Sequence, residues 1–243
     1  MPTEDAAELT LRPVVQGVDD DQVADVHLAA RRQAPMPAPV HAEASIRRWL
    51  AGRLRAEDPV WVAEAGGAVV GYARFPGAWL DDLYVHPDHQ GRGVGTALLE
   101  LVKAQRPDGF CLWVFESNTP ARAFYERHGL VALERTDGSG NEEGAPDVRM
   151  AWPGSAPLTF FRGLIDEADA QLGDLLARRT ALTTAVQRHK AAGGSAPQRD
   201  PDREAEIAAR LASRAPALGE ERLRRIVHVI ITESLDAADE APR

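Results

Sequence analysis

The sequence predicts two domains of different fold class, a mixed α/β domain over residues 1–153 and an all-α domain over residues 154–243. Three observations lead to this prediction. Short β-like runs alternate with helical segments as far as Trp152, and no strand pattern follows it. A segment containing proline, glycine and serine, residues 153–157, separates the two patterns. Most of the acidity lies in the first part, which has 15 basic and 23 acidic residues against 13 and 14 in the second.

The composition indicates a globular protein with a substantial core. Hydrophobic residues make up 44% of the chain and charged residues 27%, and the apolar runs are too short to span a membrane. The N-terminal segment is acidic and lacks a signal peptide's apolar stretch, so we expect a soluble, cytoplasmic protein. A net charge of −9 argues against a general nucleic-acid binder. The single cysteine, Cys111, and the histidine spacing lead us to expect neither a disulfide nor a metal site.

The expected elements of the first half follow from the spacing of apolar and turn residues. Runs rich in branched and aromatic residues predict strands at 9–15, 79–87, 110–115 and 147–152, and a hairpin at 59–75. Apolar residues at three- and four-residue spacing predict helices near 19–32 and 42–55, after residue 95, and between Asn118 and Gly129.

The loop QGRGVG, residues 90–95, opens one of these helices. Backbone N–H groups gathered at the positive end of a helix dipole bind phosphate, and the three glycines would let the backbone approach an anion closely. The spacing GxGxG differs from the GxGxxG of a dinucleotide-binding loop, and the GK[ST] of a P-loop is missing. From these residues alone, a pyrophosphate site and a turn without a ligand remain alternatives.

The run LDDLYVHPDHQGRGVG, followed by NTPARAFYERHGL, resembles the GNAT N-acetyltransferase family over roughly residues 8–152. The resemblance implies a mixed α/β fold that binds acetyl-CoA as a cosubstrate between two splayed strands and transfers the acetyl group to an amine. It also implies that the cofactor is bound by the backbone of one strand, by the pyrophosphate loop and by a residue beside the cofactor arm. These residues are Leu83, Val85, Gln90, Gly91, Arg92, Gly93, Gly95, Thr96 and Asn118.

The same resemblance implies that Tyr125 protonates the departing CoA thiolate. A phenol with a pKa near 10 can do this, and the alternative is an aromatic residue packed in the core beside Phe124. Asp81, Asp82 and Glu116 are candidate general bases, although each could be a solvated surface group and a water chain could serve instead. The sequence does not identify the acceptor amine.

The second half predicts three helices. Apolar residues recur at helical spacing from 158 to about 192, which makes a helix of roughly 50 Å. A domain of about 90 residues cannot cover such a helix, so we expect it to pair with another chain. Asp200, followed by proline, has the form of a second helix start, and a third helix is expected from about 219 to 238.

Two cationic residues stand out on the first of these helices. Arg179 occupies a position where the apolar stripe predicts a hydrophobic residue, and Lys190 lies about 16 Å further along the axis, within about 20° of the same face. The chain has only one other lysine, Lys103. A buried cation without a partner is costly, so an anionic ligand would explain the pair. The alternative is that both side chains reach solvent or pair with acids.

The segments LTFFRGLIDEADAQLGDLLARR, RDPDRE and IITES resemble the all-helical, AroQ-type chorismate mutase family over about 158–238. The resemblance implies an intertwined homodimer that rearranges chorismate to prephenate, a reaction of the shikimate pathway and aromatic amino acid biosynthesis, without a cofactor. Arg162 of the partner chain and Arg179 would hold the two carboxylates, and Lys190 would face the ether oxygen. The implied site residues are Arg162, Arg179, Lys190, Asp200, Arg203, Glu204 and Ser234, with Glu204 also among the catalytic ones.

One position departs from this family pattern. Four residues after Ser234 the family usually has a glutamine or glutamate that shares the ether oxygen with the lysine, whereas this chain has Ala238. Either a shift in the helix end brings another group in, or the site is weakened, which favours a non-catalytic domain for dimerisation and aromatic-acid sensing. Because the same cationic residues serve related reactions, a domain that acts on isochorismate or aminodeoxychorismate is a further alternative. The expectation from the sequence is a bifunctional N-acetyltransferase and chorismate mutase, without nucleic-acid or membrane partners.

Overall fold

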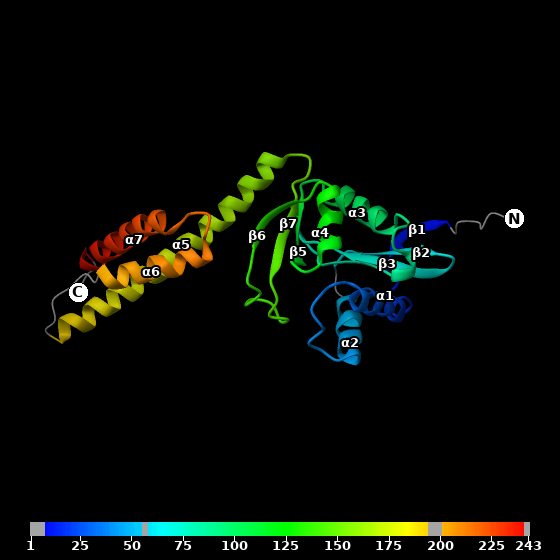
Figure 1. Cartoon of the computed structure of the whole chain (residues 1–243), viewed down its shortest axis with the longest axis horizontal. Helices are drawn as coiled ribbons and strands as arrows, with labels where there is room; N and C mark the ends of the chain where they lie inside the picture. Colours follow the sequence, from blue (N-terminus) through cyan, green and yellow to red (C-terminus); the bar gives the residue numbers. More distant parts are fainter. Residues whose placement is uncertain (1–7, 55–57, 194–200, 241–243) are drawn as a thin grey trace. The chain divides into compact units, whose positions relative to one another are not determined.

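The computed structural model describes residues 8–54, 58–193 and 201–240. The chain divides into two compact units, Met1–Arg162 and Gly163–Arg243 (Figure 1). The boundary between the units, at 162/163, falls inside helix α5 (Pro157–Ala192), nine residues after the change of pattern that the sequence shows at 153/154.

The described strands of the N-terminal unit form two antiparallel sheets. The first has the order β1-β2-β3-β4 and the second the order β5-β7-β6. The strands of the first sheet are β1 (Leu9–Pro13), β2 (Val60–Ala65), β3 (Ala68–Arg74) and β4 (Asp82–Val85). Those of the second are β5 (Phe110–Phe115), β6 (Val131–Arg135) and β7 (Asp147–Trp152). Gly66 and Gly67, with φ of 59° and 80°, make the predicted hairpin turn between β2 and β3.

Helices lie on both faces of the first sheet (Figure 1). On one face, α1 (Asp20–Gln33) and α2 (Glu43–Leu54) bury a cluster that includes Val26, Leu50 and Tyr72. On the other face, α3 (Val94–Gln105) and α4 (Thr119–Arg127) bury a second cluster that includes Leu98 and Tyr125 and continues into the second sheet. The side chains of β4 therefore alternate between two separate cores.

The C-terminal unit is helical, as the sequence predicts. It contains α5 from Gly163 onward, α6 (Pro201–Arg214) and α7 (Glu220–Glu240). Helices α6 and α7 bury Ala208, Leu223 and Val227, whereas α5 has no buried residue. Within the described ranges, no helix combines the length and apolar character needed to cross a membrane.

Candidate functional sites

Strands β4 and β5 meet at one end and then separate. Trp79 and Cys111 form an isolated parallel bridge, at which the N–H of Leu80 donates to the carbonyl of Cys111 at 2.8 Å and the N–H of Cys111 donates to that of Ala78 at 2.9 Å. Beyond this point β4 is paired with β3 and β5 with β7, so the two strands belong to different sheets. This is the splayed arrangement that the sequence led us to expect.

The backbone of β4 has hydrogen-bonding groups on the side away from β3. The N–H of His86 donates to the carbonyl of Val70 at 2.8 Å. Because the residues that bond to an antiparallel neighbour alternate along a strand, the N–H and C=O groups of Leu83 and Val85 point away from β3. The side-chain amide of Gln90 donates to the carbonyl of Val85 at 3.1 Å. The glycine-rich loop is therefore attached to this free edge.

The loop after the 3-10 helix η1 (Pro87–His89) gathers backbone N–H groups at the start of α3. Gly91 and Gly93 have φ of 72° and 84°, the left-handed region that glycine adopts most easily. No described residue is recorded as accepting a hydrogen bond from the N–H groups of residues 91–96. These groups stand at the positive end of the helix dipole, which is favourable for an anion. The residues present fit the pyrophosphate of a CoA ester.

The other predicted loop residues differ in what they contribute. Gly95 lies inside α3 and does not have a positive φ, so its backbone conformation does not require glycine. A Cβ at this position would be 3.6 Å from the ring of Phe124, an ordinary contact distance. Thr96 Oγ1 lies 3.3 Å from Nε2 of His128. Arg92 is exposed. A bound phosphate could therefore meet the open backbone and the Arg92 guanidinium.

Asn118 and Tyr125 lie at opposite ends of α4. Asn118 is the N-cap, because its Oδ1 accepts the N–H of Ala121 at 3.3 Å. Tyr125 is buried, and its ring meets that of Phe124 edge-on with centroids 5.3 Å apart. Burial raises the pKa of Tyr125 above its ordinary value, and nearby Tyr84 raises it further. The phenol is therefore protonated at neutral pH, which suits both a core residue and a proton donor.

The three candidate bases are all ion-paired. Arg74 contacts Asp82 through Nε and Asp81 through Nη2, each at 2.7 Å. Burial raises the pKa of both carboxyl groups, and the charge of Arg74 opposes this rise. Glu116, at the end of β5, pairs with Arg135. Each carboxylate thus has a structural role in addition to any role in proton transfer.

A buried polar cluster beside these carboxylates was missed by the sequence reasoning. His27 Nδ1 lies 2.8 Å from the hydroxyl of Tyr72, and the ring centroids of His27 and Tyr84 are 4.5 Å apart. Burial lowers the pKa of His27 to about 4 and raises that of Tyr84 to about 12, so both are neutral at pH 7. Tyr72 and Tyr84 are register partners on β3 and β4. The two tyrosines lie in predicted strands, and this was the only signal that the sequence offered for the cluster. His27 is 45 residues away from Tyr72, so no local pattern could connect it with them.

In the C-terminal unit, an arginine joins α5 to α7. Arg179 Nη1 donates to the hydroxyl of Ser234 at 2.5 Å and to the carbonyl of Ile230 at 3.2 Å. The hydroxyl of Ser234 donates to the same carbonyl at 2.6 Å. Ser234 is 4% exposed. One arm of the guanidinium is thus fixed to the protein, and among the described residues no partner is recorded for its other N–H groups.

Lys190 lies 11 residues after Arg179, about 16 Å along the axis of α5. Its side chain is half-buried, and the described part of the chain records neither a hydrogen bond nor an ion pair for it. The alternative that Lys190 pairs with an acid therefore finds no support among the described residues. An ammonium in this setting is a donor that favours an anionic partner.

Arg203 and Glu204 lie in the first turn of α6. Among their contacts, Arg203 pairs with Glu206 at 2.5 Å, and both side chains are more than half exposed. Glu204 Oε2 lies 3.6 Å from Nδ1 of His228 on α7, and Glu204 is only 17% exposed. Asp200, which was predicted to act with them, lies outside the described residues. Glu204 thus contacts α7 from α6.

Arg162 is exposed near the start of α5. In any α-helix, residues 17 positions apart lie about 25 Å apart along the axis. Arg162 and Arg179 of one chain therefore cannot hold the two carboxylates of one small molecule. A site that uses both arginines needs Arg162 from a second chain, which is what the sequence resemblance implies.

The apolar residues of α5 form an exposed stripe, which we call the α5 stripe. It comprises Ile165, Leu172, Leu175, Leu182 and Val186, each at least half exposed. Monomeric proteins rarely expose a contiguous apolar patch of this kind. The α5 stripe is therefore a helix face that a single chain does not bury.

Comparisons with known proteins match the two parts of the chain separately. Residues 56–130 match the family model described as an acetyltransferase (GNAT) domain. Residues 161–238 match the model described as chorismate mutase type II. The two matches follow the same order as the two units of the structure, and the second spans nearly the whole of the C-terminal unit.

Individual relatives resemble the N-terminal part. The L-amino acid N-acyltransferase MnaT of Escherichia coli is 44% identical over 130 residues, covering 49% of this chain and 72% of the relative. The mycothiol acetyltransferase of a Parafrankia species is 43% identical over 118 residues, and the match spans 44% of this chain but only 36% of the relative. A GCN5-related N-acetyltransferase structure from Rhodopseudomonas palustris has a TM-score of 0.51 at 24% identity, covering 63% of this chain and 99% of that one. The structural likeness shows the shared fold.

Proposed function

Because the chain belongs to the GNAT acetyltransferase family and carries a chorismate mutase type II domain at residues 161–238, we propose that it is bifunctional. Its N-terminal domain, residues 1–153, transfers an acetyl group from acetyl-CoA to an amine. Its C-terminal domain, residues 154–243, rearranges chorismate to prephenate. We further propose a cytoplasmic homodimer, which the lone buried cysteine and the exposed α5 stripe support.

The splayed strands and the open N–H groups of the loop carry the acetyltransferase proposal. Acetyl-CoA supplies the activated acetyl group when bound. The backbone of Leu83 and Val85 would hold its pantetheine arm, and the N–H groups of residues 91–96 would hold its pyrophosphate. Tyr125 would then donate a proton to the leaving thiolate. Its raised pKa keeps the phenol protonated over the whole neutral range.

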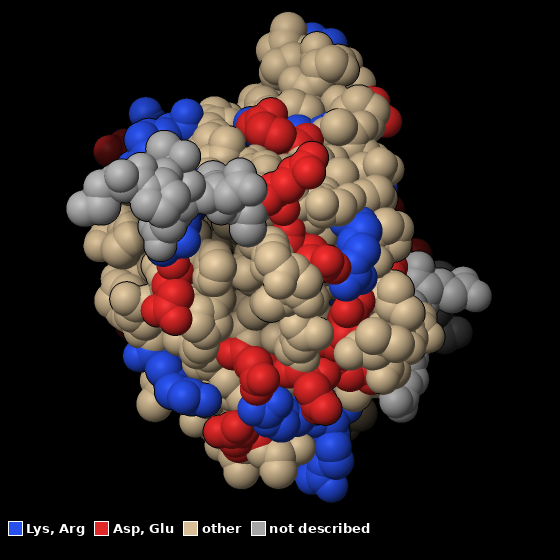
Figure 2. All heavy atoms as spheres, turned by 90° about the vertical axis from the view of Figure 1, so that its right-hand side faces the viewer, with Lys and Arg blue, Asp and Glu red and all other residues tan. Residues whose placement is uncertain are grey.

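We propose a small primary amine, of the class of free L-amino acids, as the acceptor. The support is the 44% identity to an enzyme named for N-acylation of L-amino acids. Figure 2 shows Asp and Glu side chains running in a band across one face of the molecule, with fewer Lys and Arg among them. Such a surface disfavours acceptors that carry a net negative charge.

The mutase proposal depends only on where the cationic side chains lie relative to the negative charges of the substrate. The rearrangement breaks an ether C–O bond and forms a C–C bond within one molecule, so it needs no nucleophile and no proton transfer. Arg179, held by Ser234, and Arg162 of the partner chain would bind the two carboxylates as planar forks. Lys190 would meet the negative charge that builds up on the single ether oxygen, for which a compact ammonium is suited.

The observation that carries this proposal is the half-buried Lys190, for which the described residues provide neither a hydrogen bond nor an ion pair, on the same helix as the anchored Arg179. Incubation of the full chain with chorismate, with products separated by chromatography, tests it. Prephenate is the predicted product. Release of pyruvate in a parallel incubation with isochorismate would identify the lyase alternative. Binding of prephenate without turnover would identify the sensing alternative, which Ala238 favours.

The acetyltransferase proposal has its own assay, independent of the first. Acetyl-CoA is mixed with the chain and a panel of L-amino acids, and the released thiol is measured. We expect thiol release with at least one amino acid and no release from peptides that offer only lysine side chains. Release with lysyl peptides alone would replace the proposed acceptor class, and absence of acetyl-CoA binding would remove the activity.

A further inference from the structure

Arg31 and Glu143 form an ion pair between two segments that are 112 residues apart in the sequence. Arg31 lies in the last turn of α1, and Glu143 lies in the connection between β6 and β7. Nη2 of Arg31 donates to Oε1 of Glu143 at 2.8 Å, and the two side chains are only 14% and 16% exposed. Nε of Arg31 is buried without a hydrogen-bond partner among the described residues. The guanidinium is therefore largely removed from solvent, while part of its hydrogen-bonding capacity is unused.

Arg31 lies beside the strand that would hold the thioester. Tyr84 is on β4 between Leu83 and Val85, whose backbone groups would bind the pantetheine arm. Burial raises the pKa of Tyr84 to about 12, whereas the charge of Arg31 and a hydrogen bond from it act in the opposite direction. Tyr84 packs against the core under α1 and α2, and Tyr125 belongs to the core on the other face of the sheet. A single phenol therefore separates Arg31 from the edge of β4 along which the acetyl thioester would lie.

The connection between β6 and β7 carries Glu143 on a folded turn. Figure 1 shows this connection extending to the side of the first sheet on which α1 and α2 lie. Asn141 holds the turn, because its amide group donates to the carbonyl of Ala145 at 2.8 Å and to Asp147 at 3.1 Å, and its Oδ1 accepts the N–H of Ala145 at 3.2 Å. Among the described residues, Arg31 is the one partner recorded for the Glu143 carboxylate. The carboxylate can therefore leave Arg31 while Asn141 keeps the turn folded.

We propose that Arg31 binds the α-carboxylate of a free amino acid acceptor, and that Glu143 occupies this position when no acceptor is bound. This inference rests on the proposed acetyltransferase function. A buried guanidinium needs an anionic partner, and a substrate carboxylate can accept two parallel hydrogen bonds from it, one of them from the buried Nε. The α-amine is attached to the carbon next to that carboxylate, so binding at Arg31 would hold the nitrogen close to Tyr84 and the thioester.

The transfer itself is that of the proposed function. The neutral amine nitrogen forms a bond to the acetyl carbon and loses a proton, the C–S bond breaks, and the leaving sulfur gains a proton. The products are the N-acetyl amino acid and CoA. Arg31 exchanges no proton in this step, so its role is to select acceptors that have a carboxylate and to orient them.

The first test compares each L-amino acid of the panel with its own amide, in which an uncharged carboxamide of nearly the same size replaces the carboxylate. The wild-type kcat/KM for the best amino acid should exceed that for its amide by about 10²-fold, the scale of losing hydrogen bonds to a charged group. Arg31→Gln should lower kcat/KM for the amino acid by a similar factor, mainly through KM, and leave the value for the amide unchanged. Arg32→Gln, at a neighbouring arginine that is 68% exposed, is the matched control and should be silent.

The second test uses the opposite roles of the two partners. Glu143→Gln removes the carboxylate that competes with the acceptor, so the KM for the amino acid should fall severalfold while kcat changes little. Glu142→Gln, at the preceding residue, which pairs with His41 and is 74% exposed, is its matched control and should be silent. If the ion pair is only structural, Arg31→Gln and Glu143→Gln break the same contact and should impair both kinds of substrate alike.

Titration with acetyl-CoA separates failure of this inference from failure of the proposed function. Every variant should bind acetyl-CoA with wild-type affinity. A wild-type chain that binds no acetyl-CoA, or that acetylates no amine, would overturn the proposed function and this inference together. Equal wild-type activity on an amino acid and its amide would overturn this inference alone, and so would losses of the same size with both substrates in Arg31→Gln and Glu143→Gln.

Discussion

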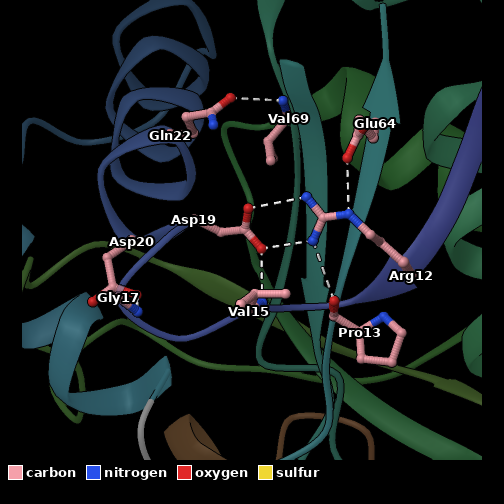
Figure 3. Close-up of polar contacts among 9 residues, drawn as sticks. All are labelled: Arg12, Pro13, Val15, Gly17, Asp19, Asp20, Gln22, Glu64 and Val69. Atoms are coloured by element: carbon pink, nitrogen blue, oxygen red, sulfur yellow. Dashed lines mark hydrogen bonds and ion pairs between the residues drawn. The ribbon is translucent and has the colours of Figure 1, made fainter. Parts of the chain in front are cut away.

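Arg12 and Asp19 form a two-point ion pair where β1 leads into α1. Nη1 and Nη2 of Arg12 lie 2.7 and 3.0 Å from the two carboxylate oxygens of Asp19, and Nε donates to Glu64 on β2 at 2.8 Å. The Asp19 carboxylate also accepts the N–H of Val15 at 2.7 Å (Figure 3). The side chain of Asp19 is 1% exposed. This contact fixes the helix that carries His27 over the sheet.

Asp19→Asn is expected to lower the free energy of unfolding of the N-terminal unit by about 2 kcal/mol at neutral pH, because hydrogen bonds to a charged group are lost. Hydrogen bonds from Arg12 hold the pKa of Asp19 below its usual 3.8. The stabilisation is thus complete above the unfolded-state pKa and is lost as the pH falls through the lower folded-state pKa. Urea unfolding at several pH values measures this. Asp21→Asn, at an exposed acid of the same helical turn, should cost less than about 0.5 kcal/mol, and equal effects would contradict the account.

Gly93→Glu is expected to abolish acetyl-CoA binding, because a carboxylate at the start of α3 repels the pyrophosphate. Gly67→Glu is a matched control, since Gly67 has φ of 80°, close to the 84° of Gly93, and neither position has an atom near an added Cβ. Both variants carry the same backbone strain of about 1–2 kcal/mol. Calorimetry should show wild-type affinity in Gly67→Glu alone. Wild-type affinity in Gly93→Glu would remove the loop from the cofactor site.

Tyr125→Phe is expected to lower acetyltransferase kcat by about 10²-fold or more with little change in the KM for acetyl-CoA. The reason is that the phenol proton is needed only when the thiolate leaves. Within the described ranges no hydrogen bond is recorded for this hydroxyl, so its removal should change the melting temperature little. An unchanged kcat would assign Tyr125 to packing against Phe124.

The sequence predicted most of the fold because its strands and helices have regular apolar spacing. FCLWVF at 110–115 is predicted with the bounds of β5. The predicted strand at 79–87 is shorter in the structure, Asp82–Val85, because Trp79 makes only a single bridge and Pro87 begins η1. The strand β6, Val131–Arg135, was missed because all five of its residues are exposed and show no alternation of polar and apolar residues.

The candidate sites could be predicted where all the site residues lie in one short segment of the sequence. The loop at 90–95 and the cations of α5 belong to local patterns, whereas the His27–Tyr72 contact joins residues that only the folded chain brings together.

Leu175→Glu is expected to convert the dimer into monomers, because Leu175 lies in the α5 stripe and is 61% exposed in a single chain. Ala177→Glu, about 200° away around the helix, places the same charge on the other face and should leave the dimer intact. Sedimentation velocity at micromolar concentration distinguishes the two. A monomeric wild-type chain would contradict the dimer and remove Arg162 from the mutase site.

The two lysines of the chain provide a matched pair for the mutase site. Lys103, in the N-terminal unit, pairs with Glu100 at 2.8 Å and donates to the carbonyl of His128 at 2.8 Å. Lys103→Arg and Lys190→Arg make the same chemical change, and each keeps the positive charge. Only at Lys190 would a broad guanidinium replace an ammonium that faces a single ether oxygen.

The rate of prephenate formation by Lys190→Arg is the measurement that most directly tests whether the helical domain is a catalytic mutase. We predict that kcat falls by about 10²-fold or more, while Lys103→Arg keeps the wild-type rate and all three proteins sediment and unfold alike. An exposed lysine with no role would be worth about 0–1 kcal/mol in stability and nothing in rate. A wild-type rate in Lys190→Arg would contradict the account and remove Lys190 from the chemistry.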